Sequence, residues 1–146
     1  MSTRSYIVRK TDEGYEGVYC HWDGYPEYNG AILMQHYSDD TKLAELISHG
    51  DMSSLGEAVG DKHDFDQRPE GVTTYYGRDR GETGVDPQRY DSLDDLFQNV
   101  VRTGCEFVYL YDGFWQFAHR GAQYFGTSDG TPFSELKPLW AAVSPV

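Results

Sequence analysis

Strand-forming side chains at the start of the chain predict a β-hairpin. Residues 5–10 (SYIVRK) and 15–22 (YEGVYCHW) are rich in such side chains. The segment between them, TDEG, ends in a glycine, which is typical of a tight turn. In the second strand Cys20 and Trp22 share one face, and His21 lies on the other face. Bulky groups occupy both faces, so neither face is expected to be fully open to solvent.

Two short helices are predicted next. Residues 31–37 form an apolar segment of helical character. Ser38, Asp39 and Asp40 resemble the cap and acidic first turn of a second helix, and Gly50 is its expected stop. The apolar residues of this second helix keep the i, i+3, i+4 spacing of one helix face: Leu43, Leu46 and Ile47.

The clearest helix signal begins at Ser92. The string SLDD is a capping-box pattern, apolar residues follow at helical spacing, and Gly104 ends the segment. Residues 106–111 and 114–119 then flank the dipeptide DG. This dipeptide favours a hairpin turn, because both of its residues tolerate a positive φ.

The remaining segments carry weaker signals. Residues 51–71 are polar and predict irregular structure, residues 72–76 (VTTYY) predict a strand, and residues 77–84 predict a long polar loop. A last short helix is expected from Thr131 onward, with the apolar residues Leu136, Leu139 and Trp140.

The expected order of elements is therefore ββ-αα-β-α-ββ-α. Hairpins joined through helices predict the α+β class, with a mostly antiparallel sheet built from hairpins and helices packed on one face. The chain has 146 residues, shows no internal repeat and contains no segment that resembles a linker. We therefore expect one domain that spans residues 1–146.

Composition and charge restrict the class of protein. Asp and Glu number 24 against 12 Lys and Arg, so the formal net charge is −12, and 15% of the residues are aromatic. The aromatic content argues against disorder, and the negative charge argues against direct binding of nucleic acid. The acidic excess also suits an inhibitor that imitates nucleic acid on a basic partner, although solubility is its simpler explanation.

The expected location is the cytoplasm. No apolar run is long enough to span a bilayer, and the first residues lack the apolar core of a signal peptide. Two cysteines, Cys20 and Cys105, are too few for a disulfide scaffold. We expect both thiols to be buried as small apolar side chains, and the many tyrosines would suit a homodimer.

The string CHWDGY at the end of the second strand is the first candidate site. His21 and Asp23 are two residues apart, so an imidazole oriented by a carboxylate is feasible for acid–base chemistry or ligand binding. The alternative is structural. In that interpretation Trp22 fills the core, Asp23 and Gly24 form a turn, and His21 bonds a local carbonyl.

The string GRDRGE is the second candidate site. Arg78 and Arg80 could offer guanidinium forks to a phosphate or carboxylate, with Asp79 and Glu82 holding them in place. In so acidic a chain, overall charge does not explain a local pair of arginines. The alternative is a solvated loop whose charges pair with one another and contribute little to stability.

The sequence contains no metal, nucleophile or phosphate-loop motif. No pair of the potential metal ligands has the spacing of a zinc site, so neither a metal nor another cofactor is expected. The acidic pairs of the chain fall at predicted helix starts, where they suit the helix dipole. The residues considered as metal ligands are Cys20, His21, His36, His49, His63, Cys105 and His119.

Several strings of the chain resemble one family. TRSYIV, VYCHWDGYPEYNG, LMQHYSDD, LISHGDMSSLGE and TYYGRDRGE are similar to small proteins found in phages, prophages and plasmids. The resemblance covers roughly residues 2–85, and the YCHWDGYP and GRDRGE strings are its most distinctive parts. It implies an accessory gene product that interferes with host processes or host defence, and it implies no activity, cofactor or catalytic residue.

The leading hypothesis is a phage- or prophage-type accessory protein that binds a small anionic, nucleotide-like ligand. In this hypothesis Arg78 and Arg80 meet the phosphates, and His21, Asp23 and Glu82 orient the site. An aromatic side chain would stack on the base, the candidates being Trp22, Tyr25, Tyr75 and Tyr76.

Two alternatives belong to other classes. The first is an inhibitor whose acidic surface binds a host protein with a basic surface, which predicts a steep dependence of binding on salt. The second is a small hydrolase or nuclease built on His21 and Asp23, with His36 and Glu82 as further candidates. All three hypotheses share one predicted fold.

Overall fold

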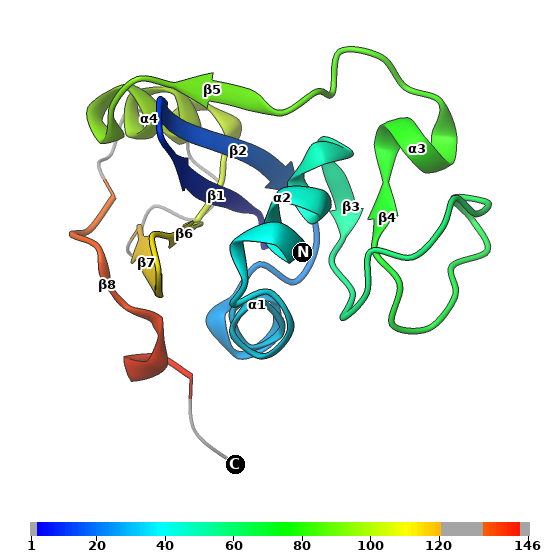
Figure 1. Ribbon diagram of the computed structural model, residues 1–146, viewed down its shortest axis with the longest axis horizontal. Helices are drawn as coiled ribbons and strands as arrows, with labels where there is room; N and C mark the ends of the chain where they lie inside the picture. The colour runs from blue at the N-terminus through cyan, green and yellow to red at the C-terminus, as the bar shows by residue number, and fades with distance from the viewer. Residues whose placement is uncertain (1–2, 121–132, 144–146) are drawn as a thin grey trace.

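The computed structural model describes residues 3–120 and 133–143, and the strands in these ranges form one mixed sheet (Figure 1). The strand order is β4-β3-β2-β1-β6-β7-β8, and β5 pairs with the first half of β2. The strands are β1 (Ser5–Thr11), β2 (Gly14–Cys20), β3 (Met52–Ser54), β4 (Thr74–Tyr75), β5 (Gln88–Tyr90), β6 (Phe107–Tyr111), β7 (Trp115–His119) and β8 (Lys137–Pro138).

Short helical segments connect the strands. They are the π-helix η1 (Pro26–Gly30), α1 (Ala31–His36), α2 (Asp40–Ser48), α3 (Tyr76–Arg80), α4 (Leu93–Val100) and the 3₁₀ turns η2 (Val101–Thr103) and η4 (Leu139–Ala141). The side chain of Asp39 caps α2 and that of Ser92 caps α4, which confirms both predicted helix starts. Within the described ranges, no helix is long and apolar enough to cross a bilayer.

β1 lies in the middle of the sheet. It pairs antiparallel with β2 and parallel with β6, and the β6–β7 hairpin follows. Both predicted hairpins are therefore present. Most of the strand pairs are antiparallel, and the predicted α+β class is confirmed.

Helices cover both faces of this sheet, whereas the sequence pattern placed them on one. Ile7 of β1 packs in a buried cluster with residues of α1 and α2. Its neighbours Tyr6 and Val8 point to the opposite face and pack with Leu96 and Val100 of α4. Both faces of β1 are buried, so apolar and polar residues do not alternate along this strand. Without that alternation, the sequence does not indicate that α4 covers the second face of the sheet.

The predictions for the middle of the chain were correct only in part. Residues 55–71 form no helix or strand, as expected for the irregular segment 51–71, but residues 52–54 form β3. The expected loop at residues 77–84 begins inside α3, which Gly81 ends in a left-handed conformation with φ +79°. The strand expected at residues 72–76 is present only as β4, because Tyr76 already starts α3.

The prediction of a last helix that carries Leu136, Leu139 and Trp140 was also wrong. Its expected start at Thr131 lies outside the described residues. Lys137 and Pro138 pair with β7 as a short edge strand, and only the single turn η4 follows. Pro138 has no N–H and is not able to continue a helix, but an edge strand tolerates it.

Candidate functional site

The two candidate strings meet at β3, the strand that the sequence did not predict. Trp22 N donates to Ser53 O at 3.0 Å, which holds the end of the first string against β3. Tyr76 N donates to Asp51 O at 3.3 Å, which holds the start of α3 beside the same strand. Residues more than 50 positions apart in the sequence therefore lie at one edge of the sheet.

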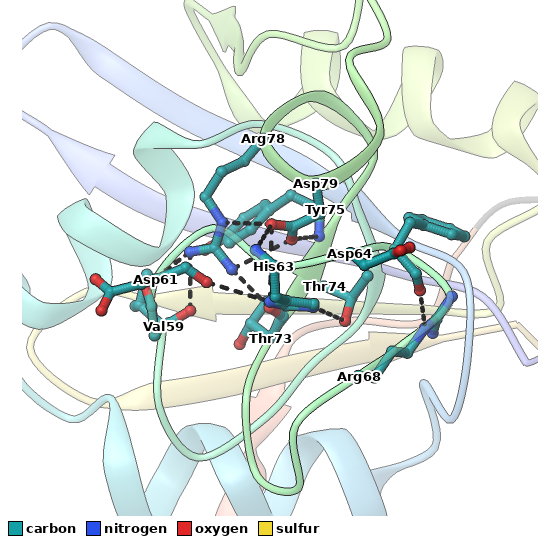
Figure 2. A network of polar contacts seen from close by, with 12 residues as sticks. Val59, Asp61, His63, Asp64, Arg68, Thr73, Thr74, Tyr75, Arg78 and Asp79 are labelled. Carbon is teal, nitrogen blue, oxygen red and sulfur yellow. Dashed lines mark hydrogen bonds and ion pairs between the residues drawn. The ribbon is translucent and has the colours of Figure 1, made fainter.

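Arg78 is a structural residue, which corrects its expected role as a phosphate ligand. Its guanidinium donates to Val59 O at 2.9 Å, Gly60 O at 2.8 Å and Thr73 O at 2.9 Å, and makes two bonds to Asp79. These are five bonds, and a guanidinium has five N–H donors. Figure 2 shows the guanidinium together with Val59, Thr73 and Asp79. No donor is left for a ligand.

Asp79 is the acceptor at the centre of the same network. Its carboxylate accepts hydrogen bonds from Tyr75 N at 2.8 Å and His63 N at 3.1 Å in addition to those from Arg78 (Figure 2). Burial alone would raise the pKa of Asp79, but these hydrogen bonds outweigh burial and lower the pKa below its ordinary value. The Asp79 carboxylate therefore stays ionised and ties the loop before β4 to α3.

Arg80 and Arg68 form a different arrangement with two aromatic rings. The guanidinium carbons of Arg80 and Arg68 lie 4.2 Å and 4.5 Å from the centre of the Phe65 ring. The Phe65 ring stacks on that of Tyr76 at 5.8 Å between centres. We call these four residues, Phe65, Arg68, Tyr76 and Arg80, the aromatic–arginine surface.

Both arginines of this surface keep donors that no group among the described residues uses. Arg80 makes two hydrogen bonds, both to Glu82, and its side chain is 48% exposed. Arg68 makes three, to Phe65 O, Ser53 Oγ and Ser54 Oγ. Since each guanidinium has five N–H donors, three remain on Arg80 and two on Arg68 among the described contacts. Glu82 thus orients Arg80, as the sequence suggested.

His21 is paired with Tyr19 rather than with Asp23. The Tyr19 hydroxyl lies 2.7 Å from His21 Nδ1. β2 ends at Cys20, and Asp23 has a left-handed φ of +57°. The chain therefore leaves the direction of the strand before Asp23, and the side chains of His21 and Asp23 do not share a strand face. Burial, and then the positive charge of Arg4, lower the pKa of His21, so its imidazole is neutral at pH 7. The hydrolase hypothesis therefore loses its acid–base pair.

The other aromatic candidates are divided between surface and core. Trp22 is 42% exposed, which corrects its alternative placement in the core, and Tyr25 is also exposed. Tyr75 is fully buried and donates to Leu46 O at 2.6 Å, so it is not available to stack on a ligand. Of the residues predicted to stack, Tyr76 is the one that lies beside an arginine with unused donors.

The described residues offer little for metal or thiol chemistry. No group of three or more His, Cys, Asp or Glu side chains among them could hold a metal ion. Cys20 and Cys105 are buried, and burial raises the pKa of each thiol to about 12, so neither is a nucleophile at neutral pH.

Sequence reasoning missed Phe65 and Arg68. They lie in the segment 51–71, which has no periodicity of strand or helix and therefore gives no local signal for a site. The available signal was chemical: an aromatic residue followed at short range by an arginine occurs both at Phe65–Arg68 and at Tyr76–Arg80. No family model, curated protein or solved structure matches this chain.

Proposed function

We propose that the protein binds a small anionic ligand that carries an aromatic ring, of the nucleotide type, on the aromatic–arginine surface. Arg68 and Arg80 bind the phosphate, and Tyr76 stacks on the ring. The observation that carries this proposal is the placement of two guanidinium groups over the Phe65 ring, with five of their N–H donors unused by residues 3–120 and 133–143.

The surface is preorganised for an anion. Arginine planes that already rest on an aromatic ring lose less side-chain freedom when a phosphate binds. Bidentate guanidinium–phosphate bonds are charge-assisted and stronger than bonds between neutral groups. Exposed ion pairs alone contribute little, so the benefit of this arrangement to folding is small and its benefit to binding is larger.

The charge of the whole chain selects the size of the ligand. A net charge of −12 repels a long polyanion such as nucleic acid, whose binding depends on many phosphate contacts. A small ligand needs only the local pair of arginines. The local pair of arginines and the resemblance to phage and plasmid accessory proteins together favour one role. In this role the protein sequesters a host nucleotide signal and does not convert it.

Calorimetric titration with AMP and ATP tests the proposal, with adenosine and inorganic phosphate as partial ligands. We expect the nucleotides to bind at least tenfold more tightly than either part. Arg68→Gln and Arg80→Gln are each expected to weaken binding about tenfold, which corresponds to about 1.4 kcal/mol. Arg89→Gln is the matched control, since Arg89 is an exposed arginine of β5 outside the surface.

The proposal is wrong if neither nucleotide binds, or if both site variants bind as tightly as the Arg89→Gln control. The first result would favour the acidic-surface inhibitor, for which a salt-sensitive complex with a basic protein is the expected behaviour.

A further inference from the structure

A second surface feature lies away from the aromatic–arginine surface. It is a groove of about 230 Å³ between α1, the β6–β7 hairpin and η4. We call it the aromatic groove, and its main lining residues are Met34, Ser38, Tyr111, Phe114, Trp115 and Trp140. None of them belongs to the proposed nucleotide site.

Two large apolar side chains of the groove are exposed to solvent instead of packing in the core. Phe114 is 44% exposed and Trp140 is 58% exposed, and their ring centres are 5.9 Å apart. Behind them the rings of Tyr111 and Trp115 lie 5.2 Å apart. Four aromatic rings therefore line one hollow, and two of them, Phe114 and Trp140, are exposed. Exposed apolar side chains that gather at a hollow mark binding sites.

The lining chemistry selects a cation. Aromatic faces carry negative electrostatic potential and attract cations, tryptophan most strongly. Ser38 and Tyr111 carry the hydroxyl groups among the six, and the Tyr111 hydroxyl already donates to Ser38 O at 3.2 Å. An ammonium group with N–H donors would find few acceptors here and would lose its hydration. A quaternary ammonium has no N–H donors and does not carry this penalty.

The charge of the chain favours the same ligand. The net charge is −12, and the exposed Asp112 lies between Tyr111 and Gly113, which both line the groove. This negative charge attracts a cation toward the rings. We propose that the aromatic groove binds a small trimethylammonium compound of the choline type.

Titration of the ¹⁵N-labelled protein with choline tests this proposal. The chain has three tryptophans, so three indole N–H signals report on binding. We expect the signals of Trp115 and Trp140 to shift and that of Trp22 to stay, because Trp22 lies at the end of β2 outside the groove. The neutral isostere 3,3-dimethylbutanol and the primary amine ethanolamine are each expected to bind at least tenfold more weakly.

Matched variants separate the groove from general hydrophobic binding. Trp140→Leu and Phe114→Leu keep apolar bulk but remove an aromatic face, and we expect each to weaken choline binding at least fivefold. Trp22→Leu is the control, since it removes an exposed tryptophan elsewhere. Circular dichroism checks that each variant is folded.

Three results would overturn the proposal. Equal binding of choline and dimethylbutanol would show an apolar groove without preference for a cation. The absence of any shift with choline would show that the groove takes no such ligand. Tighter binding of a trimethyllysine peptide than of choline would assign the groove to a protein tail rather than to a small molecule. Each result is independent of nucleotide binding at the other surface.

Discussion

Arg78 and Asp79 are consecutive residues, and their side chains are nevertheless joined by two hydrogen bonds of 3.0 Å and 3.2 Å. Consecutive side chains on a helix diverge and rarely meet. Here Asp79 is fixed by Tyr75 N and His63 N, and the long Arg78 side chain turns back over the Tyr75 ring, 4.6 Å from its centre. The pair closes the loop of residues 59–73 onto the start of α3.

Replacement of Arg78 is expected to destabilise the fold. Arg78→Gln removes most of five hydrogen bonds and leaves the buried Asp79 charge uncompensated, so the free energy of unfolding should fall by about 3 kcal/mol. Arg78→Lys restores the charge but not the planar fork, and should recover only part of the loss. Urea denaturation measures both variants. Arg80→Gln is the matched control and should stay within about 0.5 kcal/mol of wild type.

The Asp51 carboxyl is expected to make stability depend on pH. Burial, the larger effect, raises the pKa of Asp51 from 3.8 to about 6, although its hydrogen bond from Tyr19 N, 3.0 Å long, acts in the opposite direction. The folded state therefore binds the proton more tightly than the unfolded chain. Stability from this group is complete below pH 3.8 and is lost as the pH rises to about 6.

Asp51→Asn isolates this effect, because the amide oxygen can still accept from Tyr19 N. Relative to wild type, the variant should gain about 1–2 kcal/mol between pH 4 and pH 7, after allowance for screening by water. Denaturation curves at several pH values measure the difference. A difference between the two proteins that does not change with pH would contradict the prediction.

The two thiols are expected to be unreactive in the folded protein. Cys20 and Cys105 are fully buried, and burial raises the pKa of both thiols to about 12. Since the thiolate is the reactive species, a disulfide reagent should modify the native protein only through opening of the fold. In urea, where the protein is unfolded, both thiols should react rapidly. Rapid modification of either thiol in native buffer would show that its burial is incomplete.

The Tyr75 hydroxyl is expected to stabilise the contact between α2 and β4. It is fully buried and donates to Leu46 O near the end of α2, where carbonyls lack partners inside the helix. Tyr75→Phe should lower the free energy of unfolding by about 1–2 kcal/mol, because it leaves a buried carbonyl with one bond fewer. Tyr25→Phe, at an exposed tyrosine, is the control and should cause little change by thermal denaturation.

Local chemistry explains which elements could be predicted. Asp39 and Ser92 cap their helices through bonds to residues two or three positions away, so the sequence near each helix start contains the whole interaction. The two hairpins follow for the same reason, since a glycine-containing turn and its flanking strands are contiguous.

Long-range contacts decided the rest. β3 is only three residues long and exists because Met52 pairs with Cys20 and Tyr75, which are far away in the chain. Arg78 and Arg80 are equivalent in the string GRDRGE, but the loop of residues 59–73 encloses the first guanidinium and leaves the second at the surface.

The sequence by itself determined the α+β class, the hairpins and the two capped helices, because these depend on neighbours along the chain. Only the tertiary structure decided that helices cover both sheet faces, that Phe65 and Arg68 join Arg80, and that Trp140 meets Phe114. Those relationships depend on the packing of segments far apart in sequence, and no local pattern encodes them.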